Sequence, residues 1–463
     1  MFTKETYISR RKKLAAEFSD GILLFLGNSE AGANYSGNDY IFRQDSSFLY
    51  FFGLDCPDLA AVMDIDSGGS IIFGDDVDMD DIIWMGPQKS VADRAAEVGV
   101  CKSYPFARLA SFIKDALEKG RRVHFLPQYR NHNKILLGEM FNVSPRAVND
   151  LASEDLIRGV VELRIIKEQC EIEQIDQACD LGYAMHMTAL KLMKPGMKEQ
   201  ELVGAMEGVC ISGGYMVSFP SILSQNGETL HNHSHHQILT PGRMCVIDAG
   251  AEIASHYCSD FTRTLPCSGK FTARQKDIYT IVSCANSYAA EIAHPGISYK
   301  EVHLAVARLM LQGLSNIGLV KGDVDEALAL GVMGLFMPHG LGHNMGLDVH
   351  DMENLGENYV GYDATVTRSS QLGLGSLRMA RTLKPGHVIT DEPGIYFIPA
   401  LIEQWKGEGK FKEFINYEAL EAYYDFGGIR LEDDLLITAD GCRRLGAKRL
   451  PITVEDVEKE MAE

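Results

Sequence analysis

The sequence predicts an α+β fold in two parts, and three observations support this prediction. Over residues 1–160, short apolar runs alternate with helical periodicity, which is typical of a mixed sheet with covering helices. In the rest of the chain, a Pro-Gly turn followed by an amphipathic helix occurs twice. Another Pro-Gly turn, followed by a strand that ends on a carboxylate, also occurs twice. The C-terminal part is therefore expected to contain an internal repeat.

The composition is that of an ordinary globular protein. Of the 463 residues, 46% are hydrophobic and 23% are charged, enough for a large core and more than one domain. The net charge of -20 disfavours nucleic acid as a partner. The ten cysteines contain no CxxC pair, which suits reduced thiols in the cytoplasm. Without a signal-peptide core or a long apolar run, we expect no membrane partner.

The N-terminal elements follow one another in the order of a mixed α/β unit. We expect helices around 10–18, 90–98 and 106–119 and strands at 21–26, 48–52, 60–65, 70–73 and 123–126. The Gly68-Gly69 turn makes the third and fourth of these strands a hairpin. The acidic run over 75–81 lacks the spacing and the late glutamate of a calcium loop, so we interpret it as a solvated face.

A long helical pattern begins at Val161 and ends before Pro195. We place the domain boundary at its start, which gives one domain over 1–160 and a second over 161–463. The repeat lies in the second domain, where 194–202 matches 294–302 and 239–250 matches 383–394. Two matches in the same order make chance recurrence of Pro-Gly the weaker interpretation.

The repeated strands end on Asp248 and Glu392, so two halves facing each other would bring these acids together across a pseudo-twofold axis. Asp260 follows in a predicted hairpin, and Glu432 interrupts an apolar strand. A carboxylate in such a strand must be paired, hydrogen-bonded or bound to a metal, because an isolated buried charge costs too much. These four acids are the first candidates for a common site.

A second candidate segment, His339–Asp351, holds three histidines and two aspartates interleaved with glycines. With His343 from this segment, the four carboxylates form an oxygen-rich ligand set. Such a set suits Mn²⁺ or Co²⁺, and two adjacent cations would neutralise acids that otherwise repel one another. The cysteines are not grouped for a thiolate zinc site.

Taken together, these motifs resemble the metal-dependent Xaa-Pro peptidases of the creatinase/methionine aminopeptidase ("pita-bread") superfamily, namely prolidase and aminopeptidase P. The matching segments, in chain order, are 42–53, VIDAG, SDFTRT, MPHGLGH, GLDVHD, EPGIY and IRLEDD. The resemblance covers nearly the whole chain. It implies an N-terminal creatinase-like domain over 1–160 and a pita-bread dinuclear metallopeptidase domain over 161–463.

The resemblance also implies a ligand set for two divalent ions, most simply Mn²⁺, with Co²⁺ or Zn²⁺ as alternatives. Asp248 would bind one ion, His343 and Glu392 would bind the other, and Asp260 and Glu432 would bridge both. Two features depart from the family pattern. Asp248 and Asp260 are twelve residues apart where eleven are expected, and Asp391 precedes Glu392 where an apolar or small residue is usual.

The remaining site residues are also implied by the resemblance. Glu392 would receive the proton of the attacking water, while His350 and His231 would hydrogen-bond the scissile carbonyl and the developing oxyanion. His339 would face the proline end of the substrate. Arg378 resembles the arginine that binds the substrate carboxylate in prolidases, a surface arginine being the alternative. Arg430 is expected to orient the bridging acid.

The metal ligands do not separate a dipeptidase from an aminopeptidase. The segment 376–381 and the insertion that runs to about Phe426 favour prolidase, with aminopeptidase P acting on longer Xaa-Pro peptides as the alternative. A non-catalytic pita-bread binding protein and a metal-free amidinohydrolase are disfavoured because all five ligands are present. We therefore expect short proline-containing peptides as substrates and, by resemblance, a homodimer.

Overall fold

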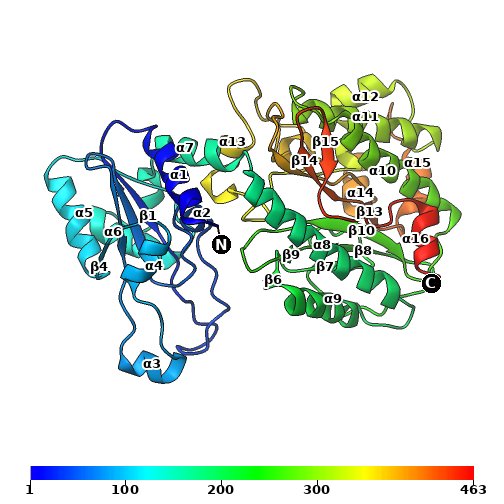
Figure 1. Cartoon of the computed structure of the whole chain (residues 1–463). Coiled ribbons are helices and arrows are strands. Elements are labelled where there is room, and N and C mark those ends of the chain that lie inside the picture. Colours follow the sequence, from blue (N-terminus) through cyan, green and yellow to red (C-terminus); the bar gives the residue numbers. More distant parts are fainter. Residues whose placement is uncertain (1) are drawn as a thin grey trace. The chain divides into compact units, whose positions relative to one another are not determined.

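The computed structural model describes residues 2–463 and divides into two compact units (Figure 1). The first unit runs to Arg164 and also contains Glu353–Tyr359. The second unit comprises Ile165–Met352 and Val360–Glu463. The chain therefore leaves the first unit, builds much of the second, and returns once to the first.

The N-terminal unit is a five-stranded mixed sheet with helices around it. The strand order is β4-β3-β2-β1-β5, in which β1 and β3 each pair with one antiparallel and one parallel neighbour. Its strands are β1 (Ile22–Leu26), β2 (Ala60–Asp64), β3 (Gly69–Phe73), β4 (Lys102–Tyr104) and β5 (Val123–Phe125). Its helices are α1 (Lys4–Ala15), α2 (Ser46–Phe52), α3 (Met79–Met85), α4 (Val91–Glu97), α5 (Arg108–Glu118), α6 (Asn131–Phe141) and α7 (Glu154–Arg164).

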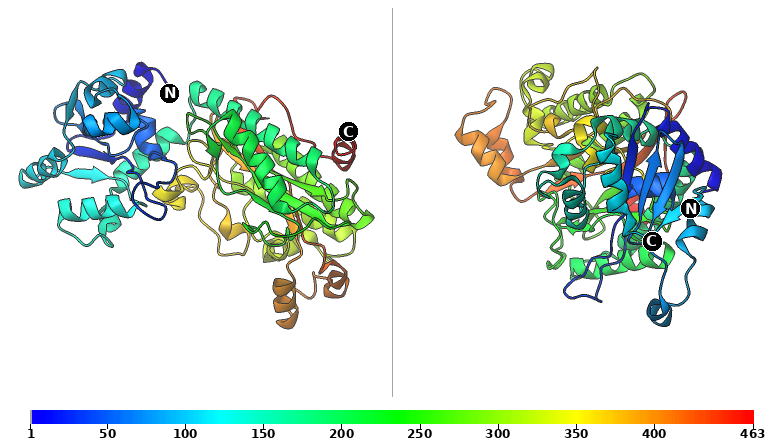
Figure 2. Two further views of the ribbon diagram at one scale, coloured as in Figure 1. Left: turned by 90° about the horizontal axis from the view of Figure 1, so that it is seen from below. Right: turned by 90° about the vertical axis from the view of Figure 1, so that its left-hand side faces the viewer.

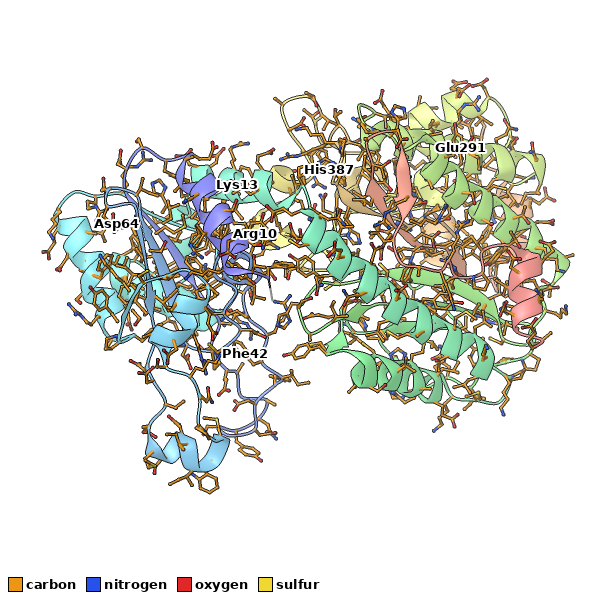
Figure 3. The ribbon with its side chains drawn as sticks, viewed as in Figure 1. Arg10, Lys13, Phe42, Asp64, Glu291 and His387 are labelled. Carbon is orange, nitrogen blue, oxygen red and sulfur yellow. The ribbon has the colours of Figure 1, made fainter. Side chains whose placement is uncertain are left out.

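Buried arginines fasten α1 to α2 inside this unit. The Arg10 guanidinium lies 3.9 Å from the centroid of the Tyr50 ring and donates to the Tyr50 carbonyl at 3.1 Å (Figure 3). Arg11 donates to the Phe51 carbonyl at 2.7 Å. These bonds satisfy carbonyls near the end of α2 that the helix itself leaves unpaired.

The strand predicted at 48–52 is wrong, because these residues belong to α2. Asp45 caps the helix by accepting from the Phe48 N–H at 2.9 Å, and Gly53 ends it in the left-handed region at φ 62°. All seven residues of α2 are buried, so the apolar run has no periodicity to distinguish helix from strand. The acidic run is mostly exposed, as interpreted, and Asp78 and Asp81 cap α3.

The single long helix predicted from Val161 is in fact two helices. The first, α7, ends at Arg164, and α8 (Gln169–Leu192) begins after a short break. The Glu171 side chain closes the start of α8 by accepting from the Glu168 N–H at 2.9 Å. The break lies where the chain passes from the first unit to the second.

The C-terminal unit contains small antiparallel sheets covered by paired helices (Figure 2). Helix α8 packs on α9 and α10 packs on α11. Its strands are β6 (Met216–Val217), β7 (Ile222–Ser224), β8 (Met244–Ala249), β9 (Ala251–Glu252), β10 (Phe261–Pro266), β11 (Val388–Asp391), β12 (Gly394–Tyr396), β13 (Gly428–Arg430), β14 (Asp433–Ile437) and β15 (Cys442–Arg444). Its other helices are α9 (Glu199–Gly213), α10 (Ala273–Ile292), α11 (Tyr299–Asn316), α12 (Val324–Leu330), α14 (Pro399–Gly407), α15 (Tyr417–Leu420) and α16 (Val454–Glu460), while α13 (Glu357–Val360) lies where the chain returns from the first unit.

The internal repeat predicted from the Pro-Gly turns is present in the backbone. The Gly196 N–H donates to the Leu239 carbonyl at 2.9 Å, and the Gly296 N–H donates to the Leu383 carbonyl at the same distance. Both glycines have positive φ, 89° and 97°, which only glycine adopts without strain. In each half, this hydrogen bond joins the Pro-Gly turn that precedes a helix to the Pro-Gly turn that precedes the carboxylate-bearing strand.

The C-terminal unit contains two three-stranded sheets, with strand orders β10-β8-β7 and β11-β14-β15. An isolated bridge between Thr262 and Glu432 connects strands of the two halves. Among the described residues, no helix has both the length and the apolar character of a membrane span.

Candidate metal centre

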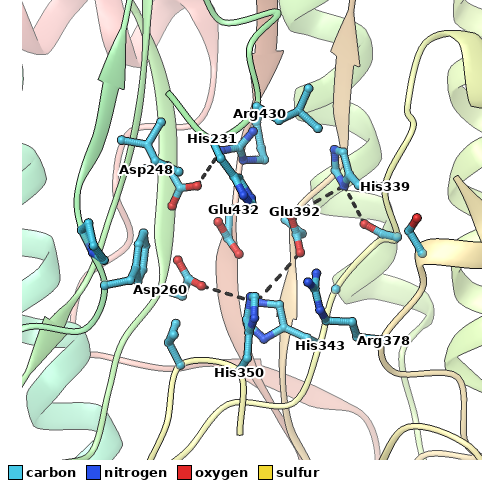
Figure 4. Close-up of a pocket in the computed structure, with 18 of the residues that line it drawn as sticks. His231, Asp248, Asp260, His339, His343, His350, Arg378, Glu392, Arg430 and Glu432 are labelled. Atoms are coloured by element: carbon cyan, nitrogen blue, oxygen red, sulfur yellow. Dashed lines mark hydrogen bonds and ion pairs between the residues drawn. The ribbon is translucent and has the colours of Figure 1, made fainter. Parts of the chain in front are cut away.

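One cavity of about 280 Å³ in the C-terminal unit is lined by every site residue that the sequence analysis selected (Figure 4). Asp248 comes from β8, Asp260 lies just before β10, Glu392 just after β11, and Glu432 between β13 and β14. The other six are His231, His339, His343, His350, Arg378 and Arg430. The repeat therefore gathers residues that are far apart in the sequence.

The extra residue between Asp248 and Asp260 is accommodated at the tip of their hairpin. His256 takes a positive φ of 68°, and its N–H donates to the Ile253 carbonyl at 2.7 Å. The strand pairing beyond the tip is regular, with Asp248 opposite Thr262. Both aspartates line the cavity, so the insertion leaves their orientation intact.

Asp260, His343 and Glu432 direct one ligand atom each toward a common point, and these atoms lie within 4.8 Å of one another. The His343 Nε2 atom is 3.4 Å from Asp260 Oδ2 and 4.0 Å from Glu392 Oε1. The other ring nitrogen, Nδ1, lies 3.0 Å from the Asn344 carbonyl and must donate to it. This bond fixes the tautomer that leaves Nε2 with a free lone pair facing the carboxylates, as a metal ligand requires.

The carboxylates crowd one another in a buried space. Burial, followed by the charge of Glu432, raises the pKa of Asp260 well above its ordinary value. Burial and the charges of Glu392 and Asp248 do the same to the pKa of Glu432. Burial raises the pKa of Glu392 to about 7, against the opposing effect of Arg430. Four acids held this closely need compensating positive charge, which two divalent cations would supply.

Two ligand oxygens have no hydrogen-bond partner among the described residues. Asp248 Oδ1 and Asp260 Oδ1 are buried and unpaired, although Asp248 Oδ2 accepts from Arg430 and Asp260 Oδ2 lies 3.4 Å from His343 Nε2. Buried polar atoms are ordinarily satisfied, so unpaired carboxylate oxygens facing this cavity fit a site for cations. The donor set of carboxylate oxygens and one imidazole fits divalent metal ions.

Arg430 was expected to orient the bridging acid Glu432, but its direct bond is to Asp248. Its Nη2 atom donates to Asp248 Oδ2 at 2.5 Å, so it contacts a terminal candidate ligand. It reaches the bridging candidate Glu432 through Thr262, whose hydroxyl accepts from Arg430 Nε at 3.1 Å and donates to Glu432 Oε2 at 2.7 Å. Thr262 was not selected from the sequence, where it is one hydroxyl within a strand.

Tyr396 was also missed. Its hydroxyl accepts from Arg430 Nη1 at 2.8 Å and lies 2.9 Å from His339 Nε2. A Cβ atom on Gly428, in the neighbouring strand, would lie 2.4 Å from the tyrosine ring. The absence of a side chain at Gly428 makes room for the Tyr396 ring. Gly428 is therefore the feature of the sequence that could have drawn attention to Tyr396.

Burial lowers the pKa of three histidines at the cavity, His231, His339 and His343. Burial, followed by Arg430, lowers the pKa of His339 to about 3 and lowers that of His231. The His350 ring contacts the His343 ring edge-on, with 4.3 Å between centroids. His233, two residues beyond His231, also lines the cavity.

The cavity has an apolar wall beside Asp248 that the sequence analysis did not identify. Strand pairing places Ile222 directly opposite Asp248, so the two side chains are neighbours on one face. Phe219, Pro220 and Leu230 also line the cavity. Arg378 and His339 lie toward the other side of the carboxylates in Figure 4.

Comparison with known proteins gives two family matches. Residues 173–439 match the metallopeptidase family M24, and residues 7–124 match the aminopeptidase P N-terminal domain. The Xaa-Pro dipeptidase of Homo sapiens is 31% identical over 474 residues, covering 99% of this chain and 92% of that protein. A probable Xaa-Pro aminopeptidase of Aspergillus clavatus is 32% identical over 430 residues, covering 90% of this chain and 88% of the other.

Solved structures of aminopeptidases have the same fold. A variant of aminopeptidase P from Escherichia coli superposes with a TM-score of 0.80 at 27% identity, covering all of this chain and 98% of the other. Proline aminopeptidase P II from Yersinia pestis gives a TM-score of 0.80 at 28% identity over the full length of both chains.

Proposed function

This chain belongs to metallopeptidase family M24, and from that membership we propose that it hydrolyses the Xaa-Pro bond of short peptides, with Xaa-Pro dipeptides preferred. The observation that carries the proposal is the convergence of four carboxylates and His343 Nε2 on one cavity that Arg378 also lines. The relatives named above include both dipeptidases and aminopeptidases, so Xaa-Pro cleavage is common to both interpretations.

Two divalent ions fit the donor set, and we propose Mn²⁺ as the native metal. Asp248 would hold one ion, His343 and Glu392 the other, and Asp260 and Glu432 both. When bound, such ions supply a hydrolytic nucleophile from water near neutral pH. Glu392 would take up the proton that water loses as it attacks the scissile carbonyl.

Two histidines bind the reacting carbonyl. His350 and His231 donate hydrogen bonds to the scissile carbonyl oxygen and to the negative charge that develops on it. His339 faces the proline ring and is itself held by Tyr396 and the Gly340 carbonyl at 2.9 and 2.7 Å. These two hydrogen bonds engage both ring nitrogens of His339, so the ring is held in one orientation before substrate arrives.

Arg378 binds the free carboxylate of the substrate in this proposal. A planar guanidinium can hold a carboxylate through two parallel hydrogen bonds, which fixes the length of the peptide. With Arg378 at the proline end, the residue before proline lies at the apolar wall beside Asp248. This placement makes the enzyme a dipeptidase in preference to an aminopeptidase.

We further propose a cytoplasmic homodimer. All ten cysteines are free thiols in the structure, which suits a reducing compartment. The dimer follows from the family alone, and the mass measured by light scattering tests it.

The function is tested by hydrolysis of Ala-Pro beside Ala-Pro-Ala, with added Mn²⁺ and with chelator. Cleavage of the dipeptide that is lost in chelator supports the proposal. Preference for the tripeptide would show an aminopeptidase, and turnover of neither peptide would show that this cavity serves another purpose.

A further inference from the structure

Lys167 and Asp351 form an ion pair in the interior of the C-terminal unit. Lys167 Nζ donates to Asp351 Oδ2 at 2.8 Å, and the side chains are only 1% and 2% exposed. Removing two charges from water is costly, and well-packed apolar side chains often stabilise a protein as well as such a pair does. The presence of this pair therefore calls for an explanation other than stability.

Asp351 ends an irregular segment, His343–Asp351, that has His343 at one end and His350 beside the aspartate. The segment contains no helix or longer strand, so its shape depends on individual bonds. The Asp351 N–H donates to the Asn344 carbonyl at 2.9 Å, and Asp351 Oδ1 accepts from the Asp348 N–H at 3.3 Å. One carboxylate oxygen of Asp351 thus folds the segment on itself, while the other binds Lys167.

Lys167 also binds the turn that leads to the metal-binding strand β11. Its N–H donates to the Gly386 carbonyl at 2.8 Å, six residues before Glu392. The ion pair packs closely against the segment, because a Cβ atom on Gly346 would lie 2.8 Å from Lys167 Cε and 2.9 Å from Asp351 Oδ2. Lys167 therefore links the approach to Glu392 with the segment that carries His350.

We propose that Lys167 and Asp351 are positioning residues for Xaa-Pro hydrolysis, holding His343–Asp351 so that the His350 imidazole faces the metal-binding carboxylates. Neither residue lines the cavity, whereas His350 does and lies against His343. Their effect on the reaction would pass through His350. The inference rests on the proposed function for the role of His350 and goes beyond it by naming what holds that residue.

The first test is Lys167→Met in the Mn²⁺-loaded enzyme, with Ala-Pro as substrate. We expect kcat to fall roughly 10- to 100-fold, since a displacement of about 1 Å in a catalytic group can cost this much. KM and the measured metal content should stay near wild type. Wild-type kcat, or loss of bound metal together with kcat, would overturn the proposal.

A double-mutant cycle then asks whether the effect passes through His350. In a His350→Ala background, Lys167→Met should lower kcat by no more than about twofold, because coupled residues are non-additive. Losses that multiply would overturn the proposed route. The matched control is Leu311→Ala, at a buried position of α11, which should lower the melting temperature and leave kcat unchanged.

A variant that lacks both charges of the Lys167–Asp351 pair distinguishes a role in positioning His350 from a role in neutralising a buried charge. Lys167→Met with Asp351→Leu removes the uncompensated charge, so its melting temperature should recover relative to Lys167→Met alone while kcat stays low. Recovery of kcat together with stability would show that the pair only balances its own charge.

A crystal structure of the Lys167→Met variant provides a measurement that does not depend on activity. We expect the His350 ring to move away from the 4.3 Å centroid separation that it has from His343. An unmoved ring would overturn the proposal. If the wild-type protein cleaves no Xaa-Pro peptide, the proposed function fails, while the ring position still decides whether Lys167 and Asp351 hold this segment.

Discussion

The two halves of the repeat carry their carboxylates, Asp248 and Glu392, on equivalent strands, but the residues packed behind these carboxylates differ. Behind Asp248, β8 presents Ile247, which is fully buried in the apolar core. Behind Glu392, β11 presents Asp391, which is also fully buried and lies directly opposite Asp433 in the neighbouring strand. Equivalent strands therefore have an apolar rear face in one half and a charged rear face in the other.

The charged rear face has its own set of arginines. Asp433 accepts from Arg263 at 2.5 Å, from Arg444 at 2.8 Å and from Arg449 at 3.1 Å. Asp391 shares this space, yet both of its carboxylate oxygens lack a hydrogen-bond partner among the described residues. The repeat therefore constrains the backbone and the face toward the cavity, while the opposite face of each strand packs independently.

The largest expected effect comes from Glu432, where the two halves meet. Glu432→Ala should remove both ions and lower kcat/KM for Ala-Pro about 1,000-fold or more, because metal-based stabilisation amounts to several kcal/mol. Asp248→Ala and Glu392→Ala should each retain about one ion per chain, since each changes a terminal ligand of one half. Elemental analysis measures the metal content and steady-state kinetics measures kcat/KM. Full activity of a metal-free Glu432→Ala protein would contradict the assignment of Glu432 as a metal ligand.

The next effect tests which side of the cavity binds the substrate carboxylate. Arg378→Met should lower kcat/KM for Ala-Pro by about 100-fold, the loss typical of one partner of a buried charge pair. Cleavage of Ala-Pro-Ala should change much less. Arg443→Met is the matched control, because Arg443 pairs with Asp176 at a partly exposed site. Equal losses for both peptides would remove Arg378 from the carboxylate role.

Acid should destabilise both halves through one buried histidine in each. Burial lowers the pKa of His186 in α8 and of His303 in α11 to about 4, whereas the unfolded value is about 6.5. Because the unfolded chain then binds more protons, stability is complete above pH 6.5 and is lost as the pH falls toward 4, by about 3 kcal/mol for each histidine.

Urea unfolding between pH 7.5 and 4 measures this loss. His186→Gln and His303→Gln should each make the dependence of unfolding free energy on pH shallower. An unchanged dependence in both variants would show that other groups control acid unfolding.

The smallest expected effect is the change in stability when Asp391, the buried acid that stands where the other half has Ile247, loses its charge. Burial and the charge of Asp433 raise the pKa of Asp391 well above its ordinary value, so this acid costs stability as the pH rises above about 4. Asp391→Asn should therefore stabilise the protein at pH 7 by about 1 to 2 kcal/mol. Unfolding in urea measures the change, with the exposed Asp80→Asn as the control. A large loss of stability would mean that Asp391 is needed as an anion beside the arginines.

The sequence predicted those features of the molecule that local chemistry determines. Pro-Gly turns such as Pro195-Gly196 have one favoured geometry, so their recurrence revealed the repeat. Glu432 could be selected because a carboxylate in an apolar strand needs a partner. The α2 helix was missed because a short run that is buried on all sides has no period, and the flanking cap residues Asp45 and Gly53 decide its structure.

The residues that support the site could not be predicted in the same way. Thr262, Tyr396 and Lys167 are ordinary residues in their local sequence. Their importance depends on which strands and loops the tertiary fold brings beside them. Arg430 illustrates the same limit, because Glu432 is only two residues away in the sequence, yet the carboxylate to which Arg430 donates directly is that of Asp248.

The return of Glu353–Tyr359 to the N-terminal unit has a consequence for biosynthesis. Within that unit, Asn354 donates to the Pro127 carbonyl at 2.8 Å, and the Arg158 guanidinium lies 5.0 Å from the centroid of the Tyr359 ring. A ribosome must therefore translate all of Ile165–Met352 before the first unit can be completed. At roughly 5–20 residues per second, the nascent unit waits on the order of ten seconds or more for its last segment.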